Sequence, residues 1–151
     1  MKLTGIVWKL SPARLRTFVA RRLQTTFTVS AAGIITNPEG KVLLLNHVLR
    51  PASGWGVPGG FMSRGEQPDV TLKREIKEET GIDLIDIRLF KVRTRGIHIE
   101  IIMTARGIGD PVVKSREIIE LDWFSVDNMP AEMPREQWRL VEEAVNWTAK
   151  S

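Results

Sequence analysis

The chain of 151 residues contains no cysteine and no tyrosine. The absence of cysteine excludes disulfides, thiolate metal sites and a cysteine nucleophile, and because it fits a reducing compartment we expect a cytoplasmic protein. No apolar run approaches the roughly 18 residues that a membrane-spanning helix needs. The length predicts one main domain with a real hydrophobic core. A net charge of +4 suits a polyanionic substrate without identifying one.

Acidic residues are also missing from the first 25 residues, where cations are frequent: Lys2, Lys9, Arg14, Arg16, Arg21 and Arg22. Ser11 and Pro12 are typical of a helix start. Apolar residues then recur at helical spacing, at Leu15, Phe18, Val19 and Leu23. The pattern predicts an amphipathic basic helix over about 12–24. We therefore divide the chain into an N-terminal helical extension, 1–25, and a domain, 26–151.

Three roles for this basic extension stay open. It can pack against the domain or against a second copy in a homodimer, which is the reading that we prefer. It can instead contact an anionic membrane surface, RNA or the substrate, since basic helices suit such partners. An arginine-rich start without acids is also typical of a targeting sequence.

The rest of the chain alternates between strand-like and helix-like segments and predicts an α+β fold. Alternating or β-branched residues indicate strands over about 26–36, 41–48, 84–94, 97–106 and 120–124, with a short extended piece near 55–57 inside a loop at 50–60. The first two strands are expected to form a hairpin across a turn at 37–40. Helices are predicted between Pro68 and Gly81, with Val70 among the residues expected on its buried side, and over about 135–148.

The most informative stretch runs from Gly60 to Ile82 and carries a cluster of acids. Residues three and four apart on a helix are neighbours, so Glu75, Glu78 and Glu79 form one carboxylate patch, and Glu66 in the preceding loop can reach toward it. Carboxylates packed this closely repel one another. They are tolerated when a hard cation such as Mg²⁺ or Mn²⁺, which prefers oxygen ligands, lies among them.

This stretch resembles the Nudix box, the signature of the Nudix hydrolases. The pattern of that family is met at every fixed position: Gly60, Glu66, Arg74, Glu75, Ile76, Glu78, Glu79, Gly81 and Ile82. Weaker similarity continues through residues 55–59 before the box and 123–124 after it. The resemblance implies a mixed β-sheet sandwiched between helices, with the box as a loop-helix-loop segment.

The resemblance also implies roles for the box residues. Glu78 and Glu79 are our first choices as ligands of Mg²⁺ or Mn²⁺. Glu75 is a further ligand or the general base that takes a proton from the attacking water. In this family the carbonyl of the box glycine is often a metal ligand, and Gly60 is the position that matches it.

Glu66 is expected to orient the helix or to coordinate the metal through water, and Arg74 to pair with a carboxylate of the box rather than with substrate. Family members often recruit a further acid from a later loop. Glu117 is the preferred candidate for this ligand or base, Glu120 is an alternative, and Glu100 is a weaker third.

The substrate must also be gripped away from the metal. Trp55 or Phe61 can stack on a base, although packing inside the protein is an equal alternative for both. Four arginines can contact phosphates: Arg50, Arg64, Arg93 and Arg95. The two histidines, His47 and His98, are more typical of a strand surface or of a satisfied polar residue than of a catalytic group.

The resemblance to the Nudix box implies hydrolysis of a diphosphate linkage in a nucleoside diphosphate derivative. Water attacks phosphorus after losing a proton to Glu75 or Glu117. Residues typical of two subfamilies are missing. Ile97 stands where ADP-ribose enzymes tend to have proline, and the chain lacks the tyrosine that dinucleoside polyphosphate enzymes tend to carry. Nucleoside triphosphates and nucleotide sugars are therefore favoured as substrates. The alternative is a non-catalytic module that binds a nucleotide or a partner protein, which an intact box disfavours.

Overall fold

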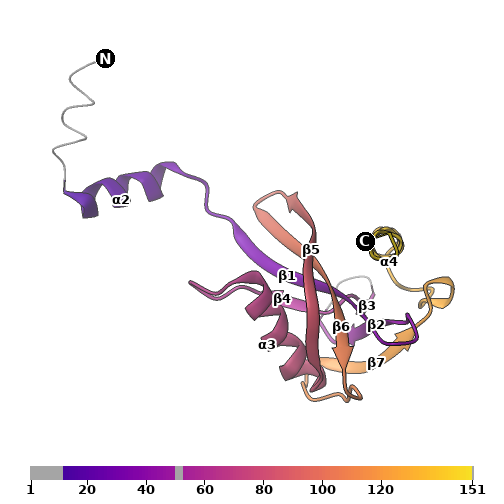
Figure 1. Cartoon of the computed structure of the whole chain (residues 1–151). Coiled ribbons are helices and arrows are strands. Elements are labelled where there is room, and N and C mark those ends of the chain that lie inside the picture. The colour runs from indigo at the N-terminus through magenta and orange to yellow at the C-terminus, as the bar shows by residue number, and fades with distance from the viewer. Residues whose placement is uncertain (1–11, 50–52, 151) are drawn as a thin grey trace.

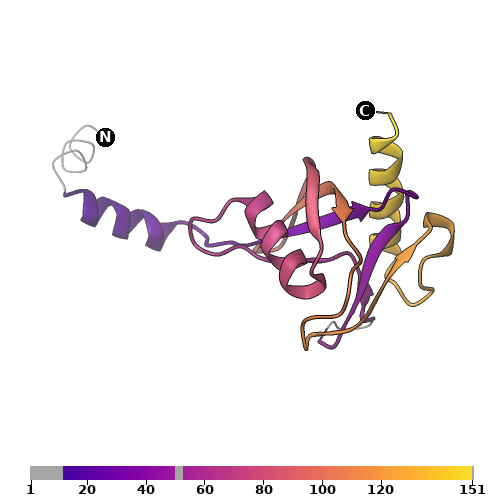
Figure 2. The same ribbon diagram turned by 60° about the horizontal axis from the view of Figure 1, so that its bottom comes forward.

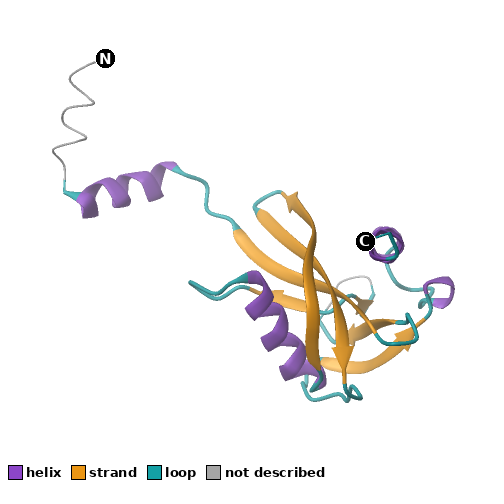
Figure 3. Cartoon of the chain, in the orientation of Figure 1, coloured by secondary structure: helices purple, strands orange, loops and turns teal. Residues whose placement is uncertain are grey.

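The computed structural model describes residues 12–49 and 53–150, without the side chains of residues 18–21 and 23. Its centre is a mixed β-sheet with helices on both faces (Figure 1, Figure 3). The predicted α+β class is confirmed. No helix in the described part of the chain is long and apolar enough to cross a membrane.

The strand β1 (Thr28–Thr36) organises the sheet. It runs parallel to β6 (His98–Ile108), with partners from Thr28 and His98 to Thr36 and Arg106. The strand β5 (Asp83–Arg95) pairs antiparallel with the other side of β6. On its second side β1 meets β4 (Gly59–Phe61) near its start and β2 (Val42–His47) at its end, where Thr36 pairs with Val42.

Beyond its short pairing with β1, the strand β2 has two strand neighbours of its own. It pairs antiparallel with β3 (Trp55–Gly56) on one side and with β7 (Ile118–Phe124) on the other. Because β1 and β2 pair next to the turn and then separate, loops from both halves of the sheet can meet in the space between them.

Successive side chains along a strand point to opposite faces of the sheet, and this divides the core into two clusters. Ala31 and Ile35 of β1 pack with Leu72 and Ile76 of helix α3 (Pro68–Thr80). Residues of the opposite parity, among them Ala32 and Ile34, pack with helix α4 (Arg135–Thr148) through Leu140, Val141 and Ala144. A short 3-10 helix, η1 (Val126–Asn128), precedes α4. Each buried leucine or isoleucine contributes about 1.5–3 kcal/mol, so these clusters fix both helices on the sheet.

The predicted elements agree with the observed ones, with two differences. The short strand β4 lies in a segment that we expected to be mostly loop, because Gly59 and Gly60 carry no strand signal. Val70, which we expected on the buried side of its helix, is exposed, and Thr71 is buried in its place. The parallel pairing of β1 with β6 was not predicted, because local patterns do not show which distant strands meet.

The helix α2 (Ala13–Leu23) lies within the range predicted for the basic extension. In both views it stands apart from the sheet and is joined to β1 by an extended segment (Figure 1, Figure 2). The division of the chain at residue 25 and the role of the extension stay predictions, as does a homodimer.

Candidate active site

A cavity of about 670 Å³ lies where β4 ends beside α3, and two walls of different origin line it. One, which we call the helix wall, consists of Gly60, Arg74, Glu75 and Glu79. The other, which we call the sheet wall, consists of Ser30, Phe61, Glu100 and Gln137. Glu117 and His47 also line the cavity.

The register of α3 positions the helix wall. Pro68 stands in the first turn of the helix, and Gly81 ends it with a left-handed φ of 79° and an N–H that donates to Lys77 O at 3.1 Å. Glu75 and Glu79 are one turn apart and both face the cavity, while Ile76 between them is buried in the core. Glu79 is only 6% exposed, so its carboxylate faces the cavity rather than bulk water.

Gly60 allows the backbone of β4 to approach α3 closely. A Cβ atom at this position would lie 2.1 Å from Cδ of Glu75, which is far inside van der Waals contact. The space that any other residue would fill is taken by the Glu75 side chain. The glycine is therefore required by the position of the Glu75 carboxylate.

Arg74 anchors the loop before the helix through Glu66. Its Nε donates to Glu66 Oε1 at 2.9 Å and its Nη2 to Oε2 at 3.0 Å, a two-pronged contact that fixes both side chains. The backbone N–H of Ser63 also donates to Glu66 Oε2, at 2.9 Å. These donors favour the charged carboxylate, and the Arg74 contact followed by that of Ser63 lowers the pKa of Glu66 to about 2.

The other side of the same guanidinium holds Glu75. Arg74 Nη1 donates to Glu75 Oε1 at 2.7 Å, and its Nη2 donates to the carbonyl of Phe61 at 3.3 Å. The contacts with Glu66 and Glu75 raise the pKa of Arg74. Arg74 therefore pairs with box carboxylates, as the sequence predicts, and its charge orients Glu75 toward the cavity.

Glu78 is placed differently from its neighbours. Its side chain is 61% exposed, with Oε2 at 3.7 Å from Nη1 of Arg74, and it is not among the described residues that line the cavity. A rotation of this exposed side chain toward Glu75 requires no change in the core. Its predicted role as a ligand stays a proposal.

The later loop brings Glu117 to the site. Two backbone hydrogen bonds anchor this loop to the end of α3: Lys114 N–H to Glu79 O at 2.9 Å and Val112 N–H to Thr80 O at 3.0 Å. The backbone carbonyl of Glu117 accepts from Val48 N–H at 2.9 Å. Glu120 lies on β7 and is not among the described cavity residues, which favours Glu117 of the two.

Gly81 makes room for this anchored loop. A Cβ atom there would lie 2.6 Å from Cε of Lys114, whose side chain crosses the end of the helix. The glycine therefore ends α3 and also allows the close approach of the segment that leads to Glu117.

The sheet wall is a cross-strand row. Phe61 of β4 pairs with Ser30 of β1, Ser30 pairs with Glu100 of β6, and Glu100 pairs with Arg93 of β5. Directly paired residues point to the same face of a sheet, and this face is the one that α4 covers. Arg93 Nε donates to Glu100 Oε2 in a short contact, and Gln137 of α4 adds its amide to the wall.

The predicted substrate contacts separate into two groups. Phe61 is 66% exposed and lines the cavity, so a flat ligand can reach its ring. Trp55 instead packs edge-on against Phe124 in the core, with ring centroids 5.2 Å apart. Arg64 is exposed and is not among the described cavity residues, and Arg50 lies outside the residues that the structure describes.

His98 is a satisfied polar residue, as predicted. Its ring nitrogens contact Thr28 Oγ1 at 2.8 Å and Ser30 Oγ at 2.9 Å, and its ring meets Phe61 edge-on at 5.6 Å. His98 thus contacts two members of the sheet wall, Ser30 and Phe61, from the same face of the sheet. Sequence reasoning did not find Ser30 or Gln137, because nothing local in the sequence distinguishes them from other polar residues.

The cavity has the donor chemistry of a Mg²⁺ or Mn²⁺ site. Glu75, Glu79 and Glu117 offer carboxylate oxygens and Gly60 offers a carbonyl, which are the ligands that these hard cations prefer. Within residues 12–49 and 53–150, no group of three or more Asp, Glu or His side chains is arranged to hold a metal ion. The residues therefore match the cation by chemical type and line one cavity, but their side chains are not arranged as a metal-binding group.

Comparison with known proteins gives one consistent result. A sequence model of the NUDIX domain matches residues 26–144. The chain is 29% identical over 133 residues to an ADP-ribose pyrophosphatase of Methanocaldococcus jannaschii, covering 83% of this chain and 78% of the relative. It is 31% identical over 126 residues to an 8-oxo-dGTP diphosphatase of Haemophilus influenzae, covering 78% of this chain and 91% of the relative.

A solved structure agrees with the sequence matches. The crystal structure of a MutT NUDIX hydrolase from Burkholderia pseudomallei superposes with a TM-score of 0.68 at 27% identity, over 77% of this chain and 96% of the other.

Proposed function

The chain belongs to the NUDIX domain family, and we propose that it is a metal-dependent hydrolase of a diphosphate linkage in a nucleoside diphosphate derivative. One observation carries the proposal: acids from two distant segments, Glu75 and Glu79 of α3 and Glu117 of the later loop, line one cavity beside Gly60. The names of the two relatives, a pyrophosphatase and a diphosphatase, support the reaction class.

Glu75, Glu78, Glu79 and the carbonyl of Gly60 are the groups that would hold the cation. When bound, Mg²⁺ or Mn²⁺ supplies positive charge that offsets the diphosphate oxygens and favours deprotonation of an attacking water. The helix α3 keeps the three glutamates about one turn or less apart, and Arg74 prevents Glu75 from turning away. Glu66 holds Arg74 in turn, so its contribution is to positioning.

The reaction needs one proton acceptor from the protein. The oxygen of water forms a bond to phosphorus, the bridging P–O bond breaks, and the proton of the water passes to a carboxylate. Glu75 and Glu117 both line the cavity, so a water bound there can lie within hydrogen-bond reach of either carboxylate. We assign the role to one of these two groups.

The choice of substrate rests on two kinds of support. The missing subfamily signs favour a nucleoside triphosphate or a nucleotide sugar. The relatives add ADP-ribose and 8-oxo-dGTP, which are named in their descriptions. All four share a nucleoside attached to a diphosphate, and that shared unit is the substrate class that we propose.

A release screen for phosphate and pyrophosphate tests the proposal. The panel contains nucleoside triphosphates with 8-oxo-dGTP, ADP-ribose, nucleotide sugars and dinucleoside polyphosphates, each with Mg²⁺ and with Mn²⁺, and Glu79→Gln serves as the blank. We expect turnover of one group that disappears in the blank and in EDTA. If a folded protein released no phosphate or pyrophosphate from any compound of the panel, the result would contradict the proposed enzyme activity and favour the binding-module alternative.

A further inference from the structure

We propose that Glu100 and Gln137 form an acceptor and donor pair that reads the edge of the substrate's nucleobase. The inference rests on the proposed function in one respect, because it takes the ligand to be a nucleotide. It concerns the sheet wall, whose residues take no part in the reaction described above.

The first step is the direction in which a nucleotide extends from the helix wall. The acids and Gly60 place the diphosphate beside α3. From there the row of Phe61, Ser30 and Glu100 crosses three neighbouring strands. Strands are about 4.8 Å apart, so the row spans about 10 Å. That length takes a nucleoside from its phosphate end to the far edge of its base, with the exposed Phe61 ring beside it.

The second step is the chemical state of Glu100. Arg93 donates from Nε to Glu100 and from Nη1 to Glu136 Oε1 at 2.8 Å, and Arg95 makes a short contact with the same Glu136. Arg93 and Glu100 are each only about one-fifth exposed, at 19% and 20%. A guanidinium so close orients the carboxylate and offsets its charge, which makes Glu100 a poor choice for binding a cation.

A charged carboxylate is only an acceptor, with about four lone-pair sites on its two oxygens. The contact with Arg93 uses Oε2, and acceptor capacity toward the cavity is left over. Glu100 therefore suits a ligand that offers an N–H.

The third step is the orientation of the Gln137 amide. Its Oε1 accepts from the backbone N–H of Val57 at 3.0 Å. A backbone N–H can only donate, so the contact identifies the oxygen of the amide and settles which way it points. The group that Gln137 can offer to a ligand in the cavity is its Nε2 amide, a donor.

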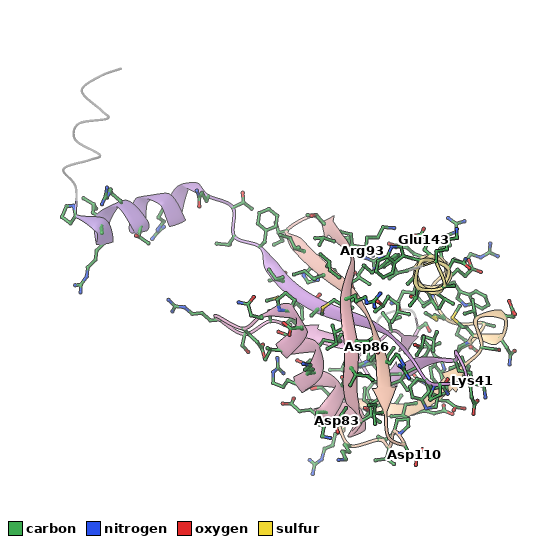
Figure 4. The ribbon with its side chains drawn as sticks, viewed as in Figure 1. Lys41, Asp83, Asp86, Arg93, Asp110 and Glu143 are labelled. Carbon is green, nitrogen blue, oxygen red and sulfur yellow. The ribbon has the colours of Figure 1, made fainter. Side chains whose placement is uncertain are left out.

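The fourth step joins the two groups. Glu136 and Gln137 are adjacent at the start of α4, and the Arg93 contact brings Glu136 to the side of β5 and β6 that carries Glu100. A second pair, Lys91 with Glu143 at 2.6 Å, holds α4 against the same face, where Figure 4 shows Arg93 and Glu143. Glu100 and Gln137 line the same cavity, so they offer it one acceptor and one donor, which complement the paired donor and acceptor on the edges of nucleobases.

Binding of three nucleotides tests the inference without turnover. The full-length chain in EDTA is titrated calorimetrically with ADP, GDP and purine riboside 5′-diphosphate, whose base carries acceptors but no N–H. We expect ADP or GDP to bind about tenfold more tightly than the purine nucleotide, as for a hydrogen bond to a charged group. A ratio within twofold for both would overturn the proposal.

The variant Glu100→Gln tests whether Glu100 is the residue that recognises the base. Arg93 can only donate, so it retains the new amide oxygen, and the amide turns its amino group toward the ligand. We expect the tenfold preference to fall to about twofold or less. Simple electrostatics predicts an unchanged preference, because removing a negative charge strengthens the binding of all three anionic nucleotides alike. A preference that survives in Glu100→Gln would rule out Glu100.

Two further variants separate reading from positioning. Glu136→Gln weakens the same Arg93 network outside the described cavity residues and is expected to leave the preference within twofold. Gln137→Glu keeps an acceptor for Val57 N–H but replaces the donor. We expect it to weaken all three nucleotides about fivefold or more relative to ribose 5-phosphate, which has no base. An equal loss of affinity for ribose 5-phosphate would show that the effect comes from the added charge alone, and would exclude Gln137 as the donor to the base.

The outcome is distinguishable from failure of the proposed function. Hydrolysis in the release screen with no base preference would support the proposed enzyme activity and contradict base recognition by Glu100 and Gln137. A base preference that depends on Glu100, without hydrolysis, would support base recognition and contradict the proposed enzyme activity.

Discussion

The helix wall and the sheet wall of the cavity are built in opposite ways. The helix wall comes from one continuous stretch, Gly60 to Glu79, in which a helix register and one arginine hold every carboxylate. The sheet wall comes from β1, β4, β6 and α4, which are up to 107 residues apart in the chain, from Ser30 to Gln137. A single helix turn controls the first wall, whereas the pairing of three strands and the docking of a helix control the second.

The difference teaches how the molecule separates two demands. Chemistry on a diphosphate needs carboxylates at fixed spacing, and a helix provides fixed spacing from local hydrogen bonds alone. Recognition of a nucleoside needs a broad surface with groups at its far end, which a sheet provides. The predictions below change one wall or a residue next to it and ask how far the two are independent, from the largest expected effect to the smallest.

The largest effect is expected from Glu79→Gln on the helix wall. The substitution removes one charged oxygen donor at a site that is 6% exposed while keeping the volume of the side chain. We expect kcat to fall by at least about a hundredfold, with the preference of the sheet wall for ADP or GDP unchanged. Steady-state kinetics and calorimetric binding in EDTA measure the two effects. Near-normal turnover would remove Glu79 from the proposed ligands.

Gly60→Ala tests whether the helix wall depends on the empty space at Gly60. Its Cβ would lie 2.1 Å from Glu75 Cδ, so Glu75 must move, and a displacement of about 1 Å costs up to about a hundredfold in rate. Gly65→Ala is the control: its φ of 82° is strained for alanine, but its Cβ meets nothing within 4 Å. We expect Gly65→Ala to lower the free energy of unfolding by about 1 kcal/mol and to leave kcat within threefold. Equal losses of kcat would show that backbone strain, not Glu75, matters.

Glu117→Gln tests the acid that joins the helix wall from a distant loop. If Glu117 takes the proton, kcat falls at least about tenfold and the acid limb of the pH profile changes. Glu120→Gln is the matched control on β7. A loss below about threefold, equal to roughly 0.7 kcal/mol of barrier, would leave Glu75 as the base.

Phe61→Ala and Trp55→Ala compare an exposed ring of the sheet wall with a packed ring of the core. Phe61 lines the cavity, so its loss is expected to raise KM about fivefold or more, in line with the value of stacking on one base, at nearly constant kcat. Trp55 packs against Phe124, so its loss lowers the free energy of unfolding by about 3 kcal/mol. The reverse pattern, with Trp55 controlling KM, would place the base elsewhere.

The smallest effect is a pH dependence of stability through Glu66. Folding lowers its pKa from the ordinary value of 4.5 to about 2, chiefly through Arg74. Such a group stabilises the folded state above the unfolded pKa, and this contribution is lost as the pH falls from about 4.5 through about 2. Glu66→Gln should therefore differ from the parent protein by a constant free energy of unfolding above about pH 5.5, and the difference should shrink below pH 4.5. Denaturant melts at several pH values measure it, and a difference independent of pH would contradict the role of the charge.

How far the sequence predicts this protein follows from the two walls. The helix bounded by Pro68 and Gly81 and the final helix at 135–148 are readable because caps and apolar periodicity are local signals. The acids of the helix wall are readable for the same reason. The strand β4 was missed because Gly59 and Gly60 carry no strand propensity, and their strand is formed by β1 beside them.

The sheet wall shows where prediction from a single sequence stops. Ser30 and Glu100 meet because β1 and β6 run parallel, a pairing that leaves no local trace in either strand. Gln137 reaches the cavity only because α4 docks across that face and its amide meets Val57. Trp55 and Phe61 look alike as aromatic residues near the box, and burial alone separates their roles.

The backbone bridge between α3 and the loop of Glu117 has a mechanical consequence. Glu79 faces the cavity with its carboxylate and holds Lys114 with its carbonyl, so the two acids Glu79 and Glu117 belong to one stiff unit. Extra residues inserted before Val112 would be absorbed by the turn at Gly109 without changing the spacing of the acids. The same insertion between Lys114 and Glu117 would push the distant acid out of range, so tolerance to change in this loop ends abruptly at the bridge.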